Sequence, residues 1–549
     1  MTATYLQVLE KLRQEFPQPV SDPVHDGYVV FFILRALDQV DALKSQAPIL
    51  GRPAEPDYAA ACASRIPEGS TALNAVIPQL VRYLEGMFIW GHPQSQINVV
   101  PNPSLASIIG VLLPLLYNPN LVSEESGRLF SEAEVRAAAM TAALVGYDVP
   151  RARGVFTFGG TGGVLYGVKI GLEKAAPGTA QAGLGKKAVV FVSDQGHYSC
   201  LSVANWLGIG QENVVSVPTH ADNSIQLPAL EAAARAALDG EKRIAAIVAT
   251  MGSTDAFGID DLAAIVALRD RLVDEYGLSY RPHVHADAVI GWAWSVFNDY
   301  DFLANPLGFR GRTVRALAAA RRGIQHLHLA DSVGIDFHKT GYTPYIAALF
   351  LVRDGIDLQL IARSPEEMPY LFQSGHYHPG MFTLETSRSA MGPMAALANL
   401  ILLGKEGYRV LLGHAVEMAE VLRERIEAHP NLTVVNDENA GPVTLFRAYP
   451  DDVDTFTVKD RELHDAGYRQ RLAEHNDYNR RIFERVHAEA LAGAGVAISL
   501  TACYRTNDFG DPIVALKSYV LSPFADESRM ESIVERVLAA RAGLQGGGD

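Results

Sequence analysis

Short apolar runs alternate with segments of helical spacing between residues 150 and 355, and this alternation limits the fold more than any other feature. One helical segment follows Asp260 and Asp261, which are suited to cap its start, and ends at Gly277. Four apolar runs are typical of buried strands: 188–192, 244–249, 283–286 and 346–352. Strand and helix in alternation predict an α/β fold, a mainly parallel sheet wrapped by helices. In such sheets ligand-binding residues follow the carboxyl ends of the strands.

The 549 residues are expected to divide into three parts. Residues 1–120 carry helical periods broken by Pro and Gly, which predicts an N-terminal helical segment. Residues 121–375 hold the large α/β domain, and residues 376–549 a small C-terminal α+β domain. Within the small domain the sequence predicts helices over 395–403 and 416–426, strands over 432–435 and 442–446, and a long charged helix over 460–491.

Composition excludes several classes of protein. The 47 basic and 62 acidic residues give a formal net charge of −15, which argues against nucleic acid or an anionic membrane as partner. Cys62, Cys200 and Cys503 form no Cys-x-x-Cys pair, so neither a disulfide scaffold nor a thiolate metal site is expected. The N-terminus lacks the apolar core of a signal peptide, and the most apolar stretch, 105–117, is too short to cross a bilayer. We therefore expect a cytoplasmic protein.

A glycine-rich loop, Gly159-Gly160-Thr161-Gly162-Gly163, precedes an apolar helical stretch. Glycines let the backbone approach a ligand closely, and the free N–H groups of a helix start favour a phosphate. The same loop is also typical of a tight turn without a ligand. The sequence carries no Walker-type nucleotide motif here.

A histidine and an aspartate stand at the ends of two predicted strands. His197 is suited to stacking on a flat ligand or to acid–base work, and equally to a structural hydrogen bond. Asp287 needs a partner if it is buried. His283 and His285 stand before it at alternate positions, but no further ligand is evident, so we expect no metal.

Lys339 follows His338 just before the last apolar run. Desolvation lowers the pKa of a lysine and favours imine formation, although most lysines simply lie at the surface. The phosphate loop, the stacking histidine, the aspartate and the lysine occur in this order at successive strand ends. Together they describe a pocket for pyridoxal phosphate, which needs an anion site, a ring clamp, a carboxylate at its pyridine nitrogen and a Schiff-base lysine.

The same segments resemble those of the group II pyridoxal-phosphate-dependent amino-acid decarboxylases, the family of glutamate, aromatic amino-acid and archaeal tyrosine/aspartate decarboxylases. The matching segments are Gly159-Gly160-Thr161, Ser193 to Ser199, Met251 to Thr254 with Asp260, Val284 to Ala288, and Ala330 to Lys339. The resemblance covers roughly residues 85 to 540. It implies the fold-type-I, aspartate-aminotransferase-like architecture and a homodimer with the active site at the subunit interface.

The resemblance also assigns roles. Lys339 would form the internal aldimine, Asp287 would hold the pyridine nitrogen, His197 would stack on the ring and Ala288 would pack beside it. The cofactor-binding residues it implies are Thr161, Gly162, His197, Thr254, Asp287, Ala288, Ser332, His338 and Lys339. Tyr370 would be the catalytic proton donor on a mobile loop, with Tyr377 as the second choice.

Two positions depart from the family pattern. The phosphate loop reads Gly-Thr-Gly-Gly where relatives often have Glu-Ser after the Thr, so backbone groups of Thr161 and Gly162 must do more. Lys517 stands where glutamate decarboxylases carry an arginine for the substrate carboxylate. A lysine offers a charge there but no bidentate fork.

The implied reaction is decarboxylation of an L-amino acid to an amine and carbon dioxide. The alternatives are a carbon–carbon lyase of the sphingosine-phosphate-lyase type, a decarboxylation-dependent aldehyde synthase, or a non-catalytic cofactor-binding protein. The substrate stays open, because segment 368–373 resembles the glutamate branch and segment 383–388 the archaeal tyrosine/aspartate branch.

Overall fold

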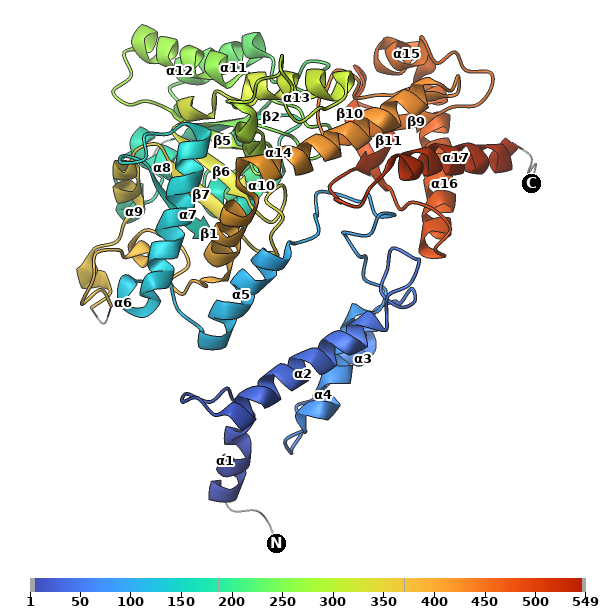
Figure 1. Cartoon of the computed structure of the whole chain (residues 1–549). Helices are drawn as coiled ribbons and strands as arrows, with labels where there is room; N and C mark the ends of the chain where they lie inside the picture. Colours follow the sequence, from blue (N-terminus) through green and yellow to red (C-terminus); the bar gives the residue numbers. More distant parts are fainter. Residues whose placement is uncertain (1–4, 185–186, 370, 546–549) are drawn as a thin grey trace.

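A computed structural model describes residues 5–184, 187–369 and 371–545. Its centre is a seven-stranded sheet with the order β1-β7-β6-β5-β4-β2-β3 (Figure 1). Strands β2 to β6 run parallel to one another, whereas β7 runs antiparallel to both of its neighbours, β6 and β1. The strands are β1 (Arg153–Thr157), β2 (Ala188–Ser193), β3 (Val214–Val217), β4 (Arg243–Thr250), β5 (His283–Asp287), β6 (Ser332–Asp336) and β7 (Ala348–Val352). The predicted mainly parallel sheet is confirmed, and its four predicted runs correspond to β2, β4, β5 and β7.

Helices cover both faces of this sheet, which gives three layers. Because successive side chains of a strand point to opposite faces, Val189 and Phe191 of β2 belong to the same buried apolar cluster as residues of α11 and α12, while Val190 and Val192 belong to the cluster with α8 and α10. The helices of this part are α5 (Leu105–Tyr117), α6 (Glu124–Gly127), α7 (Leu129–Val145), α8 (Gly160–Ala175), α9 (Thr179–Ala182), α10 (Ser199–Trp206), α11 (Leu227–Asp239), α12 (Leu262–Tyr276) and α13 (Gly311–Ile324).

Helix α12 begins and ends where the sequence predicts. The Asp261 side chain accepts the N–H of Ala264, 3.0 Å away, and Gly277 ends the helix in the left-handed region at φ 57°. Asp260 does not cap the helix. Its buried carboxylate instead accepts the N–H groups of Ile225 and Thr250, and burial raises its pKa to about 7.

A second, four-stranded antiparallel sheet with the order β10-β11-β9-β8 lies in the C-terminal part. Its strands are β8 (Leu432–Val434), β9 (Val443–Ala448), β10 (Ser499–Thr506) and β11 (Pro512–Tyr519). The accompanying helices are α14 (Met391–Glu427), α15 (Val458–His464), α16 (Arg469–Leu491) and α17 (Glu527–Gln545). The two helices predicted near 395 and 416 both fall within α14, which is interrupted at Gly404 (φ 52°, ψ −169°).

The prediction of one continuous helix over 460–491 is wrong. The chain leaves helical geometry at Asp465, whose side chain accepts the N–H of Gly467 at 2.8 Å. Aspartate competes for backbone N–H groups in this way, which ends α15 and starts a short turn before α16.

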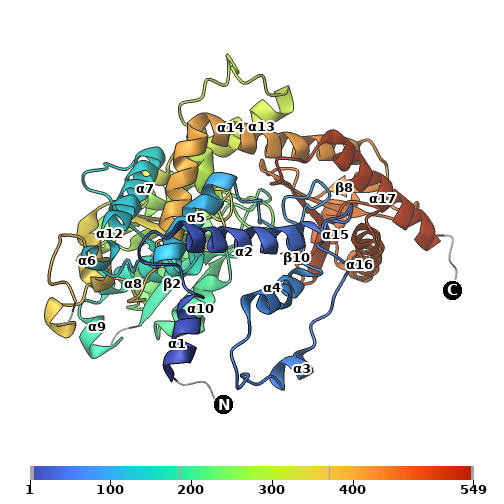
Figure 2. The same cartoon turned by 60° about the horizontal axis from the view of Figure 1, so that its bottom comes forward.

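The N-terminal part is helical, as predicted. Its helices are α1 (Tyr5–Arg13), α2 (Pro23–Asp41), α3 (Tyr58–Cys62) and α4 (Leu73–Val81). Asp22 caps α2 and Pro23 occupies the first turn, where a missing N–H costs nothing. Figure 1 shows α1 to α4 below the rest of the molecule, and in Figure 2, where the bottom of that view comes forward, α2 lies in front of the body. No residue described in α1 or α2 is buried. The three-part division at residues 120 and 375 stays a prediction.

Within the described ranges, no helix joins enough length to enough apolar character to cross a membrane.

Candidate active site

Four of the predicted site residues lie at the carboxyl ends of neighbouring parallel strands, β2, β4, β5 and β6. His197 follows β2, Thr254 follows β4, Asp287 ends β5 and Lys339 follows β6. The Lys339 ammonium acts to lower the pKa values of both Asp287 and His197, so each of these side chains lies within electrostatic range of the lysine.

Lys339 forms an ion pair with Asp336, a residue that was not among the predicted site residues. Its Nζ lies 2.9 Å from Oδ2 of Asp336, the last residue of β6. Burial alone would lower the pKa of Lys339, but the carboxylates of Asp336 and Asp287 hold it above its ordinary value. The signal was present in the sequence as the three-residue spacing of Asp336 and Lys339, which brings two side chains together across a turn.

His338 is buried beside this pair. Its Nε2 lies 3.4 Å from the same Asp336 oxygen, and its Nδ1 lies 3.1 Å from the carbonyl oxygen of Ala347. The ring of Tyr345 packs against it with centroids 4.1 Å apart. The histidine thus holds the turn that carries Lys339.

Asp287 is a buried carboxylate with an open side. Burial raises its pKa to about 6, against the opposing effect of Lys339. Its Oδ1 contacts no hydrogen-bond partner among the described residues. A buried carboxylate of this kind needs a cation or a donor to complete it, which fits a protonated pyridine nitrogen. Ala288 follows and is fully buried.

His197 stands on the loop between β2 and α10. Its Nδ1 accepts the N–H of Ser199 at 3.2 Å, which fixes the ring at the start of the helix. Partial burial and the nearby Lys339 both lower its pKa. The ring is therefore neutral at pH 7 and suited to stacking on a flat, apolar ring.

The glycine loop forms the turn from β1 into α8. Gly159 has φ 127°, a conformation that favours glycine, and α8 starts at Gly160. A Cβ on Gly162 would lie 2.1 Å from Oγ1 of Thr157, so the packing at the helix start requires a glycine. A Cβ on Gly160 would lie 3.0 Å from Oδ2 of Asp336, which brings the loop to the lysine site. Thr161 is exposed at this helix start.

Lys517, the predicted substrate-carboxylate cation, is already paired. Its Nζ lies 2.6 Å from Oδ1 of Asp255, the residue after Thr254. The hydroxyl of Thr501 donates to the other Asp255 oxygen at 2.9 Å. The ammonium therefore already has a carboxylate, and the prediction that it serves a substrate carboxylate gains no support from this geometry. Asp255 was not identified from the sequence, since nothing in the local pattern marks it.

Ser332 lies at the other end of β6 from Lys339. Its hydroxyl contacts Nε2 of His283 at 2.7 Å and Nδ1 of His285 at 2.8 Å. Burial lowers the pKa values of both histidines, to about 3 for His285. The structure therefore places this predicted cofactor residue in a neutral hydrogen-bonded cluster inside the sheet, apart from the lysine site.

Of the two predicted loop tyrosines, the structure describes Tyr377. Tyr370 lies outside the described residues. The hydroxyl of Tyr377 lies 3.1 Å from Oε2 of Glu134, and burial together with that carboxylate raises its pKa well above the ordinary value. Glu134 also forms a buried ion pair with Arg388. Tyr377, which is half-buried, therefore belongs to a polar cluster with the buried Glu134 and Arg388.

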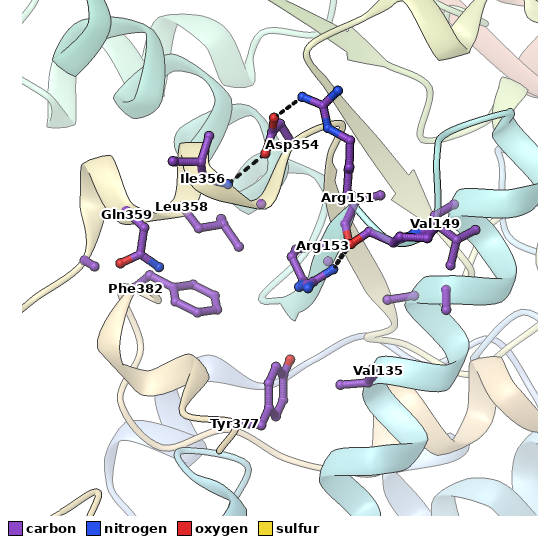
Figure 3. Close-up of a pocket in the computed structure, with 18 of the residues that line it drawn as sticks. Val135, Val149, Arg151, Arg153, Asp354, Ile356, Leu358, Gln359, Tyr377 and Phe382 are labelled. Atoms are coloured by element: carbon purple, nitrogen blue, oxygen red, sulfur yellow. Dashed lines mark hydrogen bonds and ion pairs between the residues drawn. The ribbon is translucent and has the colours of Figure 1, made fainter.

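Tyr377 also lines a pocket of about 930 Å³ at the edge of the sheet (Figure 3). Val135 of α7, Leu358 and Phe382 contribute apolar walls, and the Arg151–Asp354 ion pair stands at the rim. None of the predicted cofactor-binding residues lines this pocket. The pocket is thus separate from the lysine site.

The residues of the lysine site fit pyridoxal phosphate. Asp287 offers an unpaired buried oxygen, Lys339 an amine, His197 a neutral ring and α8 a glycine-lined helix start. Among the described residues, no three His, Cys, Asp or Glu side chains are grouped so as to hold a metal ion.

Comparison with known proteins agrees with this fit. Residues 59–448 match the pyridoxal-dependent decarboxylase conserved domain. An aspartate 1-decarboxylase of Aliivibrio fischeri is 28% identical over 264 residues, 48% of this chain and 42% of that protein. An L-2,4-diaminobutyrate decarboxylase of Rhizobium meliloti is 25% identical over 408 residues, 72% of this chain and 74% of that protein. The alignment with the first relative thus spans less than half of its length.

The fold is shared with solved structures. The glutamate decarboxylase domain of a Vibrio parahaemolyticus diaminobutyrate-pyruvate transaminase and L-2,4-diaminobutyrate decarboxylase superposes with a TM-score of 0.73. The match covers 97% of this chain and 99% of that one at 18% identity. The predicted fold-type-I architecture is confirmed.

Proposed function

This chain belongs to the pyridoxal-dependent decarboxylase family, and we propose that it converts an L-amino acid to its amine and carbon dioxide with pyridoxal phosphate as cofactor. The observation that carries the proposal is the position of Lys339 between the carboxylates of Asp336 and Asp287, next to a glycine-lined helix start. These are the parts that the cofactor requires: an amine, an acid for its ring nitrogen and a cradle for its phosphate.

Each residue has one task in this proposal. Lys339 supplies the amine that binds the cofactor covalently. Asp287, with its pKa near 6, is mostly ionised at neutral pH and holds a proton on the ring nitrogen. His197 stacks on the ring. When bound, the cofactor supplies a conjugated ring that accepts the electron pair left by the departing carboxylate.

Backbone and neighbouring groups complete the cofactor site in the proposal. Thr161 and Gly162 lie at the positive end of α8, which suits a phosphate. The Gly162 N–H donates to the Gly159 carbonyl at 2.8 Å in the structure, so in the proposal this bond is exchanged for one to the phosphate. Thr254, Ala288 and His338 form the walls: Thr254 follows β4, Ala288 follows Asp287 at the end of β5, and His338 precedes Lys339 after β6. Ser332 and Lys517 are left out, because each is already bonded elsewhere.

The substrate class is tested with a panel that the relatives suggest: aspartate, tyrosine and 2,4-diaminobutyrate, with glutamate added from the resemblance of the 368–373 segment. The purified protein is loaded with pyridoxal phosphate, and carbon dioxide release is measured for each amino acid. We expect release from at least one, and none from a Lys339→Ala variant. No release from any acidic, aromatic or diamino acid contradicts the proposal, and oxygen uptake together with aldehyde formation indicates the aldehyde-synthase alternative.

A homodimer is part of the proposal. Apolar side chains are exposed along the described helices α1, α2 and α5, among them Phe31 (53% exposed), Leu34 (54%), Leu105 (79%) and Tyr117 (82%). An apolar surface of this extent is typical of an interface rather than of a free monomer. In the proposed homodimer, a second copy of this chain covers the apolar surface, so no other protein is needed to cover it. Light scattering coupled to size-exclusion chromatography measures the molar mass and tests the homodimer. The mass of a monomer contradicts it.

A further inference from the structure

The Asp336 carboxylate lies beside both Lys339 and the start of α8. Its Oδ2 lies 2.9 Å from the Lys339 ammonium and would lie 3.0 Å from a Cβ on Gly160, the first residue of α8. The side chain is almost fully buried, at 2% exposure. Its Oδ1 has no hydrogen-bond partner among the described residues. One carboxylate therefore lies both on the lysine and at the helix start.

Among the described residues, five charged or titratable groups interact with Asp336. Lys339 and His338 lie on its own turn, at 2.9 Å and 3.4 Å. Its charge also acts on Asp287 from β5, on His197 from the loop after β2 and on Tyr345 from the loop before β7. Of these groups only Lys339 carries a positive charge at neutral pH, so the lysine alone balances the carboxylate.

We propose that Asp336 opposes the cofactor phosphate, so that it sets how tightly this site holds pyridoxal phosphate compared with the same molecule without its phosphate. The inference rests on the proposed function, because it takes the start of α8 as the phosphate cradle. A phosphate there meets the Asp336 carboxylate as its neighbour, and like charges in a buried site repel strongly. The wild-type site therefore holds its cofactor less tightly than its donor groups alone allow.

The departure of the glycine loop from the family pattern makes this charge more important. The two positions after Thr161 are Gly162 and Gly163, which have no side-chain donors, and the Gly162 N–H already donates to the Gly159 carbonyl at 2.8 Å. Fewer donors at the helix start leave the opposing carboxylate less compensated. The affinity for the phosphate thus depends on the helix start on one side and on Asp336 on the other.

The test compares two ligands in the full-length, cofactor-free protein. Dissociation constants for pyridoxal phosphate and for pyridoxal are measured by absorbance titration in wild type and in Asp336→Asn. Removing one negative charge beside the phosphate is expected to raise the preference for pyridoxal phosphate over pyridoxal about tenfold. An unchanged or smaller preference overturns the inference.

Asp287→Asn is the matched control, since it also removes a carboxylate that acts on Lys339, but one that is not among the three atoms nearest a Cβ on Gly160. We expect no gain in phosphate preference from it, and an equal gain would show that the effect passes through the lysine alone. Asp336→Ser repeats the test if the Asn variant does not fold. If neither neutral variant folds, Asp336→Glu must weaken pyridoxal phosphate more than pyridoxal, because it keeps the charge and extends it toward Gly160. A wild type that binds neither ligand through Lys339 instead contradicts the proposed function.

Discussion

Lys517 and Asp255 form an ion pair in which only one partner reaches solvent. Their charged atoms lie 2.6 Å apart, with 37% of the Asp255 side chain exposed but only 4% of the Lys517 side chain. Water can hydrate the Asp255 carboxylate when the lysine is removed. The buried Lys517 ammonium, in contrast, depends on the carboxylate to balance its charge. The pair joins the loop after β4 to β11 of the small sheet.

Loss of Asp255 is therefore expected to cost more stability than loss of Lys517. Asp255→Ala leaves a buried, uncompensated ammonium, which we expect to lower the free energy of unfolding by about 3 kcal/mol, against about 1 kcal/mol for Lys517→Met. Urea unfolding of both variants measures the difference, with Thr501→Val as a control that loses only the neighbouring 2.9 Å hydrogen bond. Equal losses, or a larger loss in Lys517→Met, contradict this assignment.

The buried carboxyl of Asp287 makes stability depend on pH. Its pKa rises from about 4 in the unfolded chain to about 6 in the folded protein, so the folded state binds more protons between these values. Stability is thus greatest below the lower pKa and falls as the pH rises through the upper one, by about 3 kcal/mol in total. The Asp287→Asn variant lacks this pH-dependent contribution to the free energy of unfolding. The stability of the cofactor-free variant should gain on that of wild type as the pH rises through this window.

Urea unfolding of the two proteins at several pH values gives this difference directly. A difference that stays constant between about pH 4 and pH 7 would show that the carboxyl is not desolvated as described.

Tyr377 has a structural role in the described geometry, so its hydroxyl is expected to matter little for catalysis. Tyr377→Phe removes one hydrogen bond to Glu134 and should lower the free energy of unfolding by about 1 kcal/mol, with decarboxylation nearly unchanged. Glu134→Gln leaves Arg388 buried without its carboxylate and should cost about 3 kcal/mol. Carbon dioxide release and thermal unfolding together measure both effects. A hundredfold or greater loss of activity in Tyr377→Phe would restore it as the proton donor.

The contact between Gly162 and Thr157 is expected to control the shape of the phosphate cradle. In Gly162→Ala the new Cβ meets Oγ1 of Thr157 at 2.1 Å, so the start of α8 must move. We expect about a tenfold weaker binding of pyridoxal phosphate, measured by absorbance titration. Adding Thr157→Ala should recover much of the affinity, since that hydroxyl has no partner among the described residues. No recovery in the double variant would place the cause elsewhere.

Sequence patterns predicted the parts of the fold that are set locally. Runs such as 188–192 are apolar throughout because β2 is buried on both faces, and Asp261 and Gly277 mark the ends of α12 by their own chemistry. Strand β6 escaped prediction because Ser332, Gly334 and Asp336 interrupt its apolar pattern. The antiparallel direction of β7 was equally hidden, since a strand's direction depends on pairing with distant residues.

The residues of the candidate active site also divide into those that local motifs identify and those that depend on tertiary packing. Lys339, Asp287 and His197 could be identified because each follows a strand end and belongs to a motif. Asp255 and Glu134 could not, since each acts on a partner more than two hundred residues away in the sequence. The mutual position of such pairs is a property of tertiary packing.

The pairing of β1 with β7 has a consequence for how the protein is made. Arg153 lies opposite Val352, so about two hundred residues separate the two strands in the chain. The phosphate cradle follows β1 and the lysine precedes β7, and the two come together only when this edge of the sheet closes. A nascent chain on the ribosome therefore cannot capture its cofactor until β7 has emerged and found its place. Cofactor capture then has to wait until at least 352 of the 549 residues have been made.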